Sequence, residues 1–502
     1  MKEKTKNNLF PIPDQVIKVT KILENKGFEA YLIGGCVRDL LLGIKPKDWD
    51  ITTNAKPEAI ISLFPKTFYE NDYGTVGIVD EETSDETIKV IEVTPYRLEA
   101  KYSNSRHPDS VLFSSKLEDD LKRRDFTINA IALKIEGKSE EKYKGQIVDL
   151  YKGQNDIKEK TLRTVGDPEE RLNEDALRML RAVRISTELG FTINQDTEKA
   201  IRNKAYLLKN ISEERIRDEF SRIILSERPM AGLVLANKLS ILGYISPEIE
   251  KGIGIEQNQA HSYDVWEHSL RSLQHAADKK WPLHIRLAAL FHDVSKPETR
   301  RWSAEKKEWT FYGHDVVGAK VAAKILSRLK FPKNTIDDVS VMIRWHMFFS
   351  DTEQITLSSV RRLLRNVGVD LIWDLMNLRI CDRVGTGRPK ENPYRLRKYK
   401  SMVEEVLRDP ISVGMLKVDG NRIMAITKAN PSPKIGFILH ALLEEVLDDP
   451  TLNTEDQLEK IVLQLNKLSD IELKKIGEKG KQKKEEEEEK DIKEIRDKYW
   501  VK

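Results

Sequence analysis

The stretch LIGGCVRDLLLG (residues 32–43), with KDWDIT (residues 47–52) shortly after it, decides the fold. An apolar run ends in two glycines, and a helix-like segment follows with an arginine in its first turn. Glycines let the backbone approach a ligand closely, and the amides and dipole of a helix start favour an anion. The pattern therefore predicts a strand, a Gly-Gly turn and a helix that together seat a phosphate.

Two aspartates follow this seat at positions that a strand would bring together. Residues i and i+2 of a strand face the same side, so Asp48 and Asp50 project two carboxylates into one space. Their repulsion calls for a cation, and two Mg²⁺ ions about 4 Å apart are the usual arrangement for phosphoryl or nucleotidyl transfer. An isolated Asp-x-Asp would more often be a cap and a turn, but the adjacent phosphate seat favours a metal site.

Composition sets broad limits. A chain of 502 residues predicts three or four domains. Lys plus Arg total 85 against 82 for Asp plus Glu, so a nucleic-acid surface must arise from local segregation of charge. Cys36 and Cys381 have no paired spacing, which excludes a disulfide framework or a Cys-based zinc site. The N-terminus lacks a signal-peptide pattern and no apolar run is long enough for a membrane span, so we expect a cytoplasmic protein without membrane partners.

The periodicity changes along the chain. It predicts a helix over 14–27, a strand over 29–33, a helix over 37–42, a strand over 49–53 and a helix over 57–63. Two more strands are expected over 76–79 and 87–93, and Pro95 should end the second of these early because proline cannot donate to a sheet ladder. From about residue 155 onward the pattern is helical.

Residues 32–54 resemble the nucleotidyltransferase signature of the class II tRNA CCA-adding enzyme and bacterial poly(A) polymerase family. The resemblance implies that Asp48 and Asp50 are catalytic and hold Mg²⁺, and that Gly35 and Arg38 seat the triphosphate. Glu92 is a candidate third carboxylate, with an outward-facing strand residue as the alternative.

Residues 122–130, KRRDFTINA, resemble the RRDFT-x-NA motif of the same family. The resemblance implies that Arg124 contacts the triphosphate or ribose, with Asp125 holding Arg124 or assisting metal binding; a surface ion pair is the alternative. Residues 102–108 are similar to the family's flexible loop near the active site.

One helix is predicted over 169–190, after Asp167-Pro168 and before Gly190. It carries residues that repeat every third position, Asp175, Arg178, Arg181 and Arg184. An ion-pair ladder would explain this spacing, but Glu174-Asp175-x-x-Arg178 resembles the family motif that reads the incoming base. Cytosine and adenine offer an amine donor beside a ring-nitrogen acceptor, which suits a carboxylate that accepts and a guanidinium that donates. Arg181 and Arg184 are interpreted as phosphate or ribose contacts.

Seven of the nine histidines fall between residues 261 and 346. Part of this set resembles the ligands of the HD phosphohydrolase superfamily and its dinuclear subset, with a divalent transition metal implied at His268, His292, Asp293, His314, His346 and Asp382. Lys296 would then steady a phosphate. The alternative is a helical domain with capping or half-buried histidines, which we keep for His261, His275 and His284.

The predicted fold class is α+β: a small mixed-sheet nucleotidyltransferase head followed by an all-α neck, body and HD domain. The expected limits are a head over 1–155, a helical neck and RNA-binding region over 156–255, an HD domain over 256–385, a helical C-terminal region over 386–470 and a charged tail over 471–502. In the C-terminal region, the helix start at 431–439 could hold an RNA phosphate through Lys434 or simply pack on the body.

The resemblance implies a tRNA nucleotidyltransferase that adds CCA from CTP and ATP to the tRNA 3′ end, with Mg²⁺ in the head and a metal-dependent phosphohydrolase site in the HD domain. One alternative is a poly(A) polymerase or an enzyme that adds only A or another part of CCA. A second is an HD phosphohydrolase whose head only binds RNA.

Overall fold

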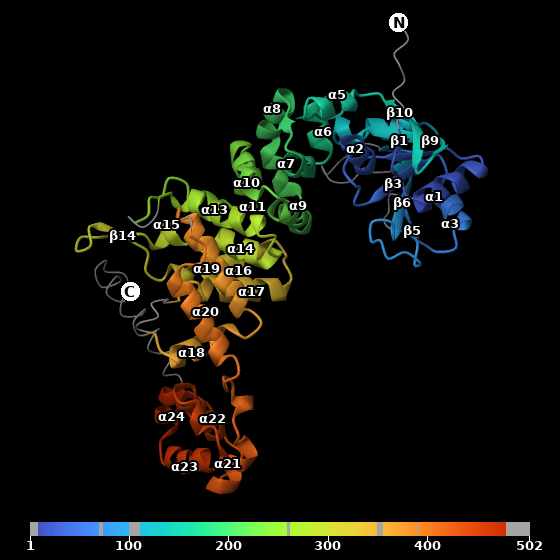
Figure 1. Cartoon of the computed structure of the whole chain (residues 1–502). Helices are drawn as coiled ribbons and strands as arrows, with labels where there is room; N and C mark the ends of the chain where they lie inside the picture. Colours follow the sequence, from blue (N-terminus) through green and yellow to red (C-terminus); the bar gives the residue numbers. More distant parts are fainter. Residues whose placement is uncertain are drawn as a thin grey trace. The chain divides into compact units, whose positions relative to one another are not determined.

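The computed structural model describes residues 9–69, 74–99, 111–258, 262–348, 355–388 and 390–477. The chain divides into two compact units, one of residues 1–223 and 231–245 and the other of residues 224–230 and 246–502. Strands dominate the start of the first unit and helices the second (Figure 1). No helix in the described ranges is both long and apolar enough to cross a membrane.

The head is built on an eight-stranded mixed sheet, counted within the described residues, in the order β1-β10-β9-β2-β3-β6-β5-β4. The strands are β1 (Leu9–Phe10), β2 (Ala30–Ile33), β3 (Trp49–Thr53), β4 (Thr67–Tyr69), β5 (Val76–Val79), β6 (Val90–Pro95), β9 (Ile131–Ser139) and β10 (Lys142–Asp149). Neighbouring strands are antiparallel except β3 and β6, which run parallel. This mixed sheet confirms the predicted fold class of the head.

Short helices and a small separate sheet complete the head. These are α1 (Asp14–Asn25), α2 (Gly35–Leu42), α3 (Pro57–Leu63), α4 (Leu117–Lys122), α5 (Gly153–Lys158), and the strands β7 (Arg97–Glu99) and β8 (Val111–Phe113). The side chains of Ile33, Tyr96, Leu121 and Ala132 form a buried cluster that packs β2 and β9 against α4. The predicted phosphate seat therefore follows a strand that is packed into the core.

The expectation that Pro95 shortens its strand is wrong. β6 continues to Pro95, which pairs with Thr53 of the parallel strand β3. The other neighbour, β5, pairs with β6 only from Val90 to Val93. A proline is compatible with the end of a strand, where one side of the ladder has already stopped.

The neck also differs from prediction, because residues 169–190 do not form one helix. Helix α6 (Pro168–Glu174) ends before Asp175, whose backbone is extended, and α7 (Leu177–Leu189) follows. The Asp175 carboxylate accepts a hydrogen bond from the Leu177 amide at 3.0 Å. Aspartate competes in this way with continued helical bonding, and the periodicity of the flanking residues concealed the break.

Further helices complete the neck, together with a short parallel bridge between two strands. They are α8 (Gln195–Lys204), α9 (Glu213–Leu225), α10 (Pro229–Lys238), α11 (Leu242–Ile245), and the strands β11 (Thr161–Leu162) and β12 (Thr192–Ile193).

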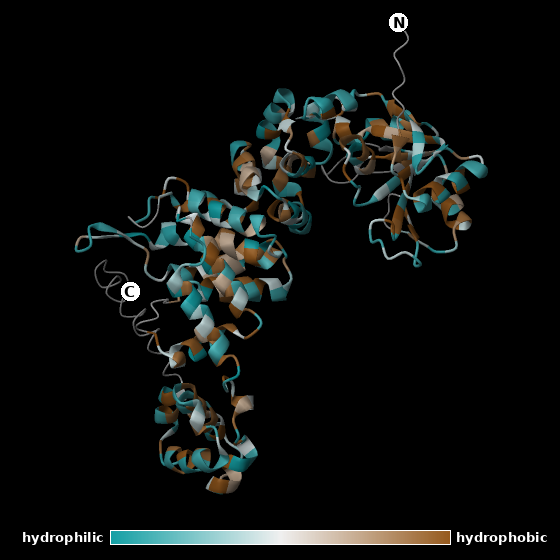
Figure 2. Ribbon diagram, in the orientation of Figure 1, coloured by the Kyte–Doolittle hydropathy of each residue, from teal (hydrophilic) through white to brown (hydrophobic). Residues whose placement is uncertain are grey.

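The second unit contains a helical bundle and a smaller helical group. The bundle has α12 (Pro247–Glu250), α13 (Val265–Asp278), α14 (Leu283–Phe291), α15 (Lys296–Thr299), α16 (His314–Arg328), α17 (Lys333–Trp345), α18 (Leu357–Val367), α19 (Ile372–Gly385) and α20 (Tyr394–Val406). Apolar residues recur along its helices (Figure 2), and many of them, such as Leu273, Leu287 and Leu375, are fully buried. The strands β13 (Arg301–Ser303) and β14 (Glu308–Thr310) form a hairpin that the helical prediction missed.

The smaller group has its own core. It consists of α21 (Gly420–Thr427), α22 (Pro433–Asp448), α23 (Glu455–Leu465) and α24 (Asp470–Gly477). Ile438, Leu442, Leu458 and Val462 are fully buried in it. Lys434 donates to the backbone oxygen of Asn466 at 2.9 Å, which favours packing for this helix start. An RNA phosphate contact there stays a prediction.

Candidate functional site

The Gly-Gly turn brings the backbone, a carboxylate and a guanidinium close together. β2 ends at Ile33, Gly34 has φ +80°, and α2 begins at Gly35. A Cβ atom on Gly34 would lie 2.9 Å from Arg124 Nη1 and 3.4 Å from Asp50 Oδ2. Position 34 is therefore restricted both by its left-handed backbone and by the space it leaves.

Asp50 lies in β3, but Asp48 directly precedes the strand instead of lying in it. The shared face of the two carboxylates stays a prediction. Trp49 between them is buried, with 1% of its surface exposed. Burial raises the pKa of the Cys36 thiol to about 12, and both aspartates add to the shift, so both carboxylates lie near this sulfur. Asp50 pairs in register with Glu92 on the parallel strand β6, which directs the two side chains to one face. Glu92 thus occupies the position expected of a third carboxylate.

Arg38 and Arg124 border the same turn, and a common asparagine connects them. Arg38 Nη1 donates to Asn129 Oδ1 at 2.8 Å, and its Nη2 lies 2.7 Å from Asp39 Oδ1. Arg124 lies 3.3 Å from Asp120 Oδ2 and 3.4 Å from the Asn129 backbone oxygen. Sequence reasoning missed Asn129 and Asp120, although Asn129 is the penultimate residue of the quoted KRRDFTINA motif.

The expectation that Asp125 holds Arg124 is wrong. Asp125 Oδ2 accepts from Arg181 Nη2 at 2.7 Å and Nε at 2.9 Å, and its Oδ1 accepts from the Phe126 amide. Burial alone would raise the pKa of Asp125, but the Arg181 guanidinium and the Asn129 amide hold it well below its ordinary value. Asp125 therefore joins the head to α7 as a buried carboxylate.

The four residues predicted to form a nucleotide-reading face have different partners. Asp175 pairs with Arg215 Nη2 at 2.7 Å, whereas Arg178 donates to Glu174 at 2.5 Å and to the Arg123 backbone oxygen at 3.1 Å. Arg184 pairs with Glu219 at 2.7 Å. Asp175 lies in the break between the helices, and Arg178 lies in the first turn of α7.

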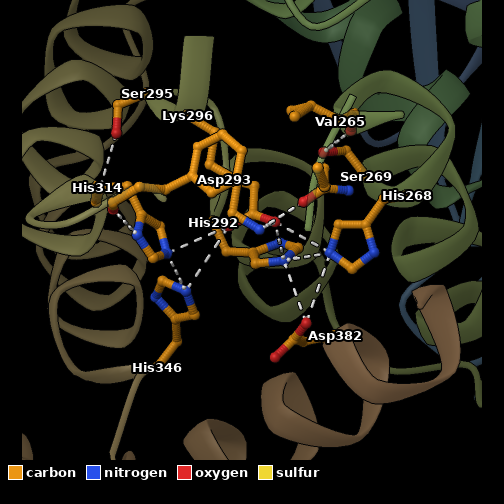
Figure 3. A network of polar contacts seen from close by, with 12 residues as sticks. Val265, His268, Ser269, His292, Asp293, Ser295, Lys296, His314, His346 and Asp382 are labelled. Carbon is orange, nitrogen blue, oxygen red and sulfur yellow. Dashed lines mark hydrogen bonds and ion pairs between the residues drawn. The ribbon is translucent and has the colours of Figure 1, made fainter. Parts of the chain in front are cut away.

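The histidine-rich part assembles all six predicted HD ligands (Figure 3). They form two groups in which the ligand atoms lie within 4.8 Å of one another: His268, His292 and Asp382, and Asp293, His314 and His346. The Asp293 carboxylate spans both groups, with Oδ2 3.1 Å from His268 Nε2 and Oδ1 3.5 Å from His314 Nε2. The arrangement suits two divalent cations that share a bridging carboxylate.

The protonation of the imidazoles supports a metal centre. His314 and His346 place Nδ1 2.7 and 2.6 Å from the backbone oxygens of Phe311 and Ile343. A carbonyl only accepts, so Nδ1 carries the proton and Nε2 keeps a lone pair. The two Nε2 atoms are 3.3 Å apart. Burial lowers the pKa of His346 to about 3, and a cation bound between the two Nε2 atoms would stabilise the lone pairs that face each other.

Lys296 and a cavity complete this centre. Lys296 Nζ lies 2.7 Å from Asp293 Oδ2 and donates to Gln257 Oε1 at 2.6 Å. A cavity of about 870 Å³ opens beside Asp293, His314 and His346. Because Lys296 contacts the predicted ligand Asp293, it fits a role in balancing that charge as well as the phosphate contact predicted for it.

Two of the remaining histidines, His275 and His284, have structural contacts outside the metal-ligand groups. His284 Nε2 lies 2.7 Å from Asp374, and His275 packs edge-on against Trp281. Neither belongs to the two ligand groups. His261 and the predicted loop at 102–108 lie outside the described residues.

Known proteins match nearly the whole chain. Residues 30–163 match the family model of the poly A polymerase head domain, residues 190–253 that of the probable RNA and SrmB-binding site of polymerase A, and residues 265–383 that of the HD domain. The CC-adding tRNA nucleotidyltransferase of Thermus thermophilus is 35% identical over 436 residues, which cover 83% of this chain and 89% of that protein. The chain belongs to the tRNA nucleotidyltransferase and poly(A) polymerase family.

This family membership confirms the resemblance found in the sequence. Two further comparisons agree with it. The CCA-adding enzyme of Geobacillus thermodenitrificans is 34% identical over 453 residues, which cover 88% of this chain and 95% of that one. The crystal structure of the Bacillus stearothermophilus CCA-adding enzyme in complex with CTP has a TM-score of 0.67 and 26% identity, and covers 90% of this chain and 97% of that chain. The similarity therefore extends over head, neck and HD domain.

Proposed function

We propose that this enzyme adds CCA to the 3′ end of tRNA from CTP and ATP. The proposal rests on Asp50, which lies beside the Gly34 turn and in register with Glu92, and on Asp48, which influences the same Cys36 sulfur as Asp50. Full-length relatives at 35% and 34% identity are a CC-adding and a CCA-adding enzyme, so the family supports tRNA end synthesis. An enzyme that adds only part of CCA is the second candidate because of the CC-adding relative. A poly(A) polymerase is a further candidate because the head matches the poly A polymerase head domain.

Different residues of the head have different roles in the reaction. Gly35 and Arg38 hold the triphosphate at the start of α2, and Arg124 contacts the phosphates or ribose from beside Gly34. Mg²⁺ bound by Asp48 and Asp50 would promote attack by the terminal ribose hydroxyl and neutralise the pyrophosphate. The hydroxyl oxygen bonds to the α-phosphorus and loses its proton, and the bond from that phosphorus to pyrophosphate breaks.

We also propose that the HD domain hydrolyses phosphate esters, using divalent transition metals held by the two ligand groups. When bound, such metals polarise a phosphate ester and activate water. His314 and His346 keep Nε2 available through their Nδ1 bonds to the backbone, and Lys296 balances the charge of Asp293. The predicted domain limits at 155, 255, 385 and 470 and a cytoplasmic location stay proposals as well.

The first test offers the full-length protein three tRNA transcripts, ending before, within and after CCA, together with an oligo(A) primer. Each nucleoside triphosphate is supplied singly with Mg²⁺, and products are resolved at single-nucleotide length. With CTP alone, a CCA-adding enzyme adds two C to the transcript that ends before CCA. With ATP alone, it adds A to the transcript that ends in CC, and it leaves the transcript with a complete CCA unextended. Failure to add the final A would identify a CC-adding enzyme, and extension of the oligo(A) primer would identify a poly(A) polymerase.

We further propose that Asp175 and Arg178 select C and A, and Asp175→Ala is expected to relax this selection. Unmatched buried polar groups cost roughly 1–3 kcal/mol each, so incorporation of G and U relative to C and A is expected to rise about 5- to 150-fold. Relative kcat/KM values for the four nucleotides measure the effect. Arg215→Gln is the control, because it removes the ion pair at Asp175 and keeps the carboxylate. Unchanged discrimination in Asp175→Ala would exclude this pair as the template.

A further inference from the structure

One carboxylate of the head, that of Asp120 in α4, is fully buried and has no part in the chemistry proposed above. Its Oδ1 accepts from Arg123 Nε at 2.9 Å and from Arg123 Nη2 at 2.6 Å, and its Oδ2 accepts from Arg124 Nη2 at 3.3 Å. A buried carboxylate is costly unless it is both paired and hydrogen-bonded. These contacts hold Asp120 in one orientation, with one oxygen toward each arginine.

Arg124 connects Asp120 to the Gly-Gly turn. A Cβ atom on Gly34 would lie 2.9 Å from Arg124 Nη1, so this nitrogen lies at the turn while Nη2 of the same guanidinium faces Asp120. Nη1 also donates to the Asn129 backbone oxygen at 3.4 Å. A guanidinium is planar and rigid, so a partner that fixes one of its nitrogens also restricts the direction of the other. The contact with Asp120 therefore restricts where Arg124 Nη1 can point.

A third contact joins Asp120 to the strand that carries Asp50. The Thr52 hydroxyl lies 3.3 Å from Asp120 Oδ2 and 3.1 Å from the Thr94 backbone oxygen. Thr52 and Asp50 are two positions apart in β3, and alternate residues of a strand face the same side. Asp120 thus contacts β3 on the face that Asp50 shares.

The surroundings of Asp120 keep its side chain charged. Burial alone would raise the pKa of Asp120, but the guanidinium groups of Arg123 and Arg124, with a further contribution from Arg97, hold it below its ordinary value. The negative charge offsets the repulsion between the neighbouring arginines. Without it, Arg124 would lose the partner that keeps its guanidinium beside Gly34.

We propose that Asp120 is a positioning residue for nucleotide addition, which holds Arg124 in place to contact the triphosphate. The inference rests on the function proposed above, because it takes Arg124 as a triphosphate contact. Asp120 is fully buried, so it acts through the arginine and not on the nucleotide itself. A guanidinium that is already in place when the nucleotide binds stabilises its charge without the cost of reorganisation.

The first test is Asp120→Asn, which keeps the shape of the side chain and removes its charge. Initial rates of CMP addition are measured with full-length protein and a tRNA transcript that lacks CCA. The kcat/KM for CTP is expected to fall roughly 10- to 100-fold, mainly through a higher KM for CTP, because a charged hydrogen bond to Arg124 is lost. The KM for the transcript should not change.

The matched control is Tyr96→Phe, which removes a buried hydrogen bond of 2.9 Å to Glu29 from the core cluster that packs against α4. Thermal unfolding of both variants shows how far each destabilises the head. Tyr96→Phe should retain the wild-type KM for CTP even where its unfolding temperature falls as far as that of Asp120→Asn.

A double-mutant cycle with Arg124→Gln separates positioning from a purely structural role. If Asp120 acts through Arg124, Asp120→Asn should lower kcat/KM for CTP less than 3-fold in the Arg124→Gln background. A structural carboxylate would lower it by the same factor in both backgrounds. Equal factors would therefore overturn the proposal, and so would a wild-type KM for CTP in Asp120→Asn or in Arg124→Gln.

Arg124→Lys tests the proposal without changing the buried site, and so applies even if Asp120→Asn does not fold. Lysine keeps the charge but lacks the fork that reaches both Asp120 and the turn, so the KM for CTP should rise as far as in Arg124→Gln. A wild-type KM for CTP in Arg124→Lys would overturn the proposal. If the wild type extends only an oligo(A) primer, the proposed tRNA substrate fails, and the same comparisons with ATP and that primer then test Asp120.

Discussion

Asp50→Ala is expected to reduce nucleotide addition to tRNA by at least about 1,000-fold, or roughly 4 kcal/mol of transition-state stabilisation. Asp50 lies in register with Glu92 and beside the Gly34 turn, so its loss removes the central carboxylate of the predicted Mg²⁺ site. Single-turnover addition of CMP to a tRNA transcript that lacks CCA measures the effect. Hydrolysis of bis(p-nitrophenyl) phosphate by the same variant should not change, because the HD ligands belong to a different compact unit.

The matched control for Asp50→Ala is Glu58→Ala, which removes an exposed carboxylate from the first turn of α3 in the same head. It should retain wild-type addition. Thermal unfolding of both variants shows whether the head remains folded. Addition within 10-fold of the wild type in a folded Asp50→Ala protein would contradict the metal site. Loss of hydrolysis together with addition would mean that the two activities are not independent.

The centre of the head could be predicted from the sequence because its determinants are local. The expected strand at 29–33, helix at 37–42 and strand at 49–53 compare with Ala30–Ile33, Gly35–Leu42 and Trp49–Thr53 in the structure. Apolar runs that end in glycines fix these elements over a few residues. The shared face of Asp48 and Asp50 was predicted from strand alternation alone, and in the structure only Asp50 lies in the strand.

The partners of the charged residues could not be predicted in the same way. Asp125 and Arg181 are 56 positions apart, and the pairing of Asp175 with Arg215 spans 40. Periodicity shows which side chains share a face, but it does not show which distant element covers that face. The same limit explains the break at Asp175, because the side-chain bond to the Leu177 amide replaces helical bonding without disturbing the pattern on either side.

The HD centre could be predicted only in part from the sequence. Its six ligands were recognised from their short motifs, but their division into two groups with Asp293 between them depends on how α13, α14, α16, α17 and α19 pack.

His292→Ala is expected to abolish metal-dependent hydrolysis at the HD centre, by at least about 1,000-fold, and to leave nucleotide addition unchanged. His292 is fully buried, and its Nε2 lies 2.9 Å from His268 Nε2 and 3.3 Å from Asp293 Oδ2, so its removal opens the ligand group with His268 and Asp382. Metal content after Mn²⁺ loading and dialysis measures the first consequence, and hydrolysis of bis(p-nitrophenyl) phosphate measures the second.

Two variants make this result specific to the metal. His284→Ala removes a histidine of the same bundle that bonds to Asp374 and belongs to neither ligand group, so it should retain both metal and hydrolysis. Asp293→Asn keeps the shape of the Asp293 side chain and removes its charge. It should therefore lose both bound metal and hydrolysis without the change in packing that His292→Ala could cause. Both losses are expected because Asp293 places one carboxylate oxygen near each group of ligands. Retention of metal and hydrolysis in a folded Asp293→Asn protein would therefore rule out a dinuclear centre at these six residues.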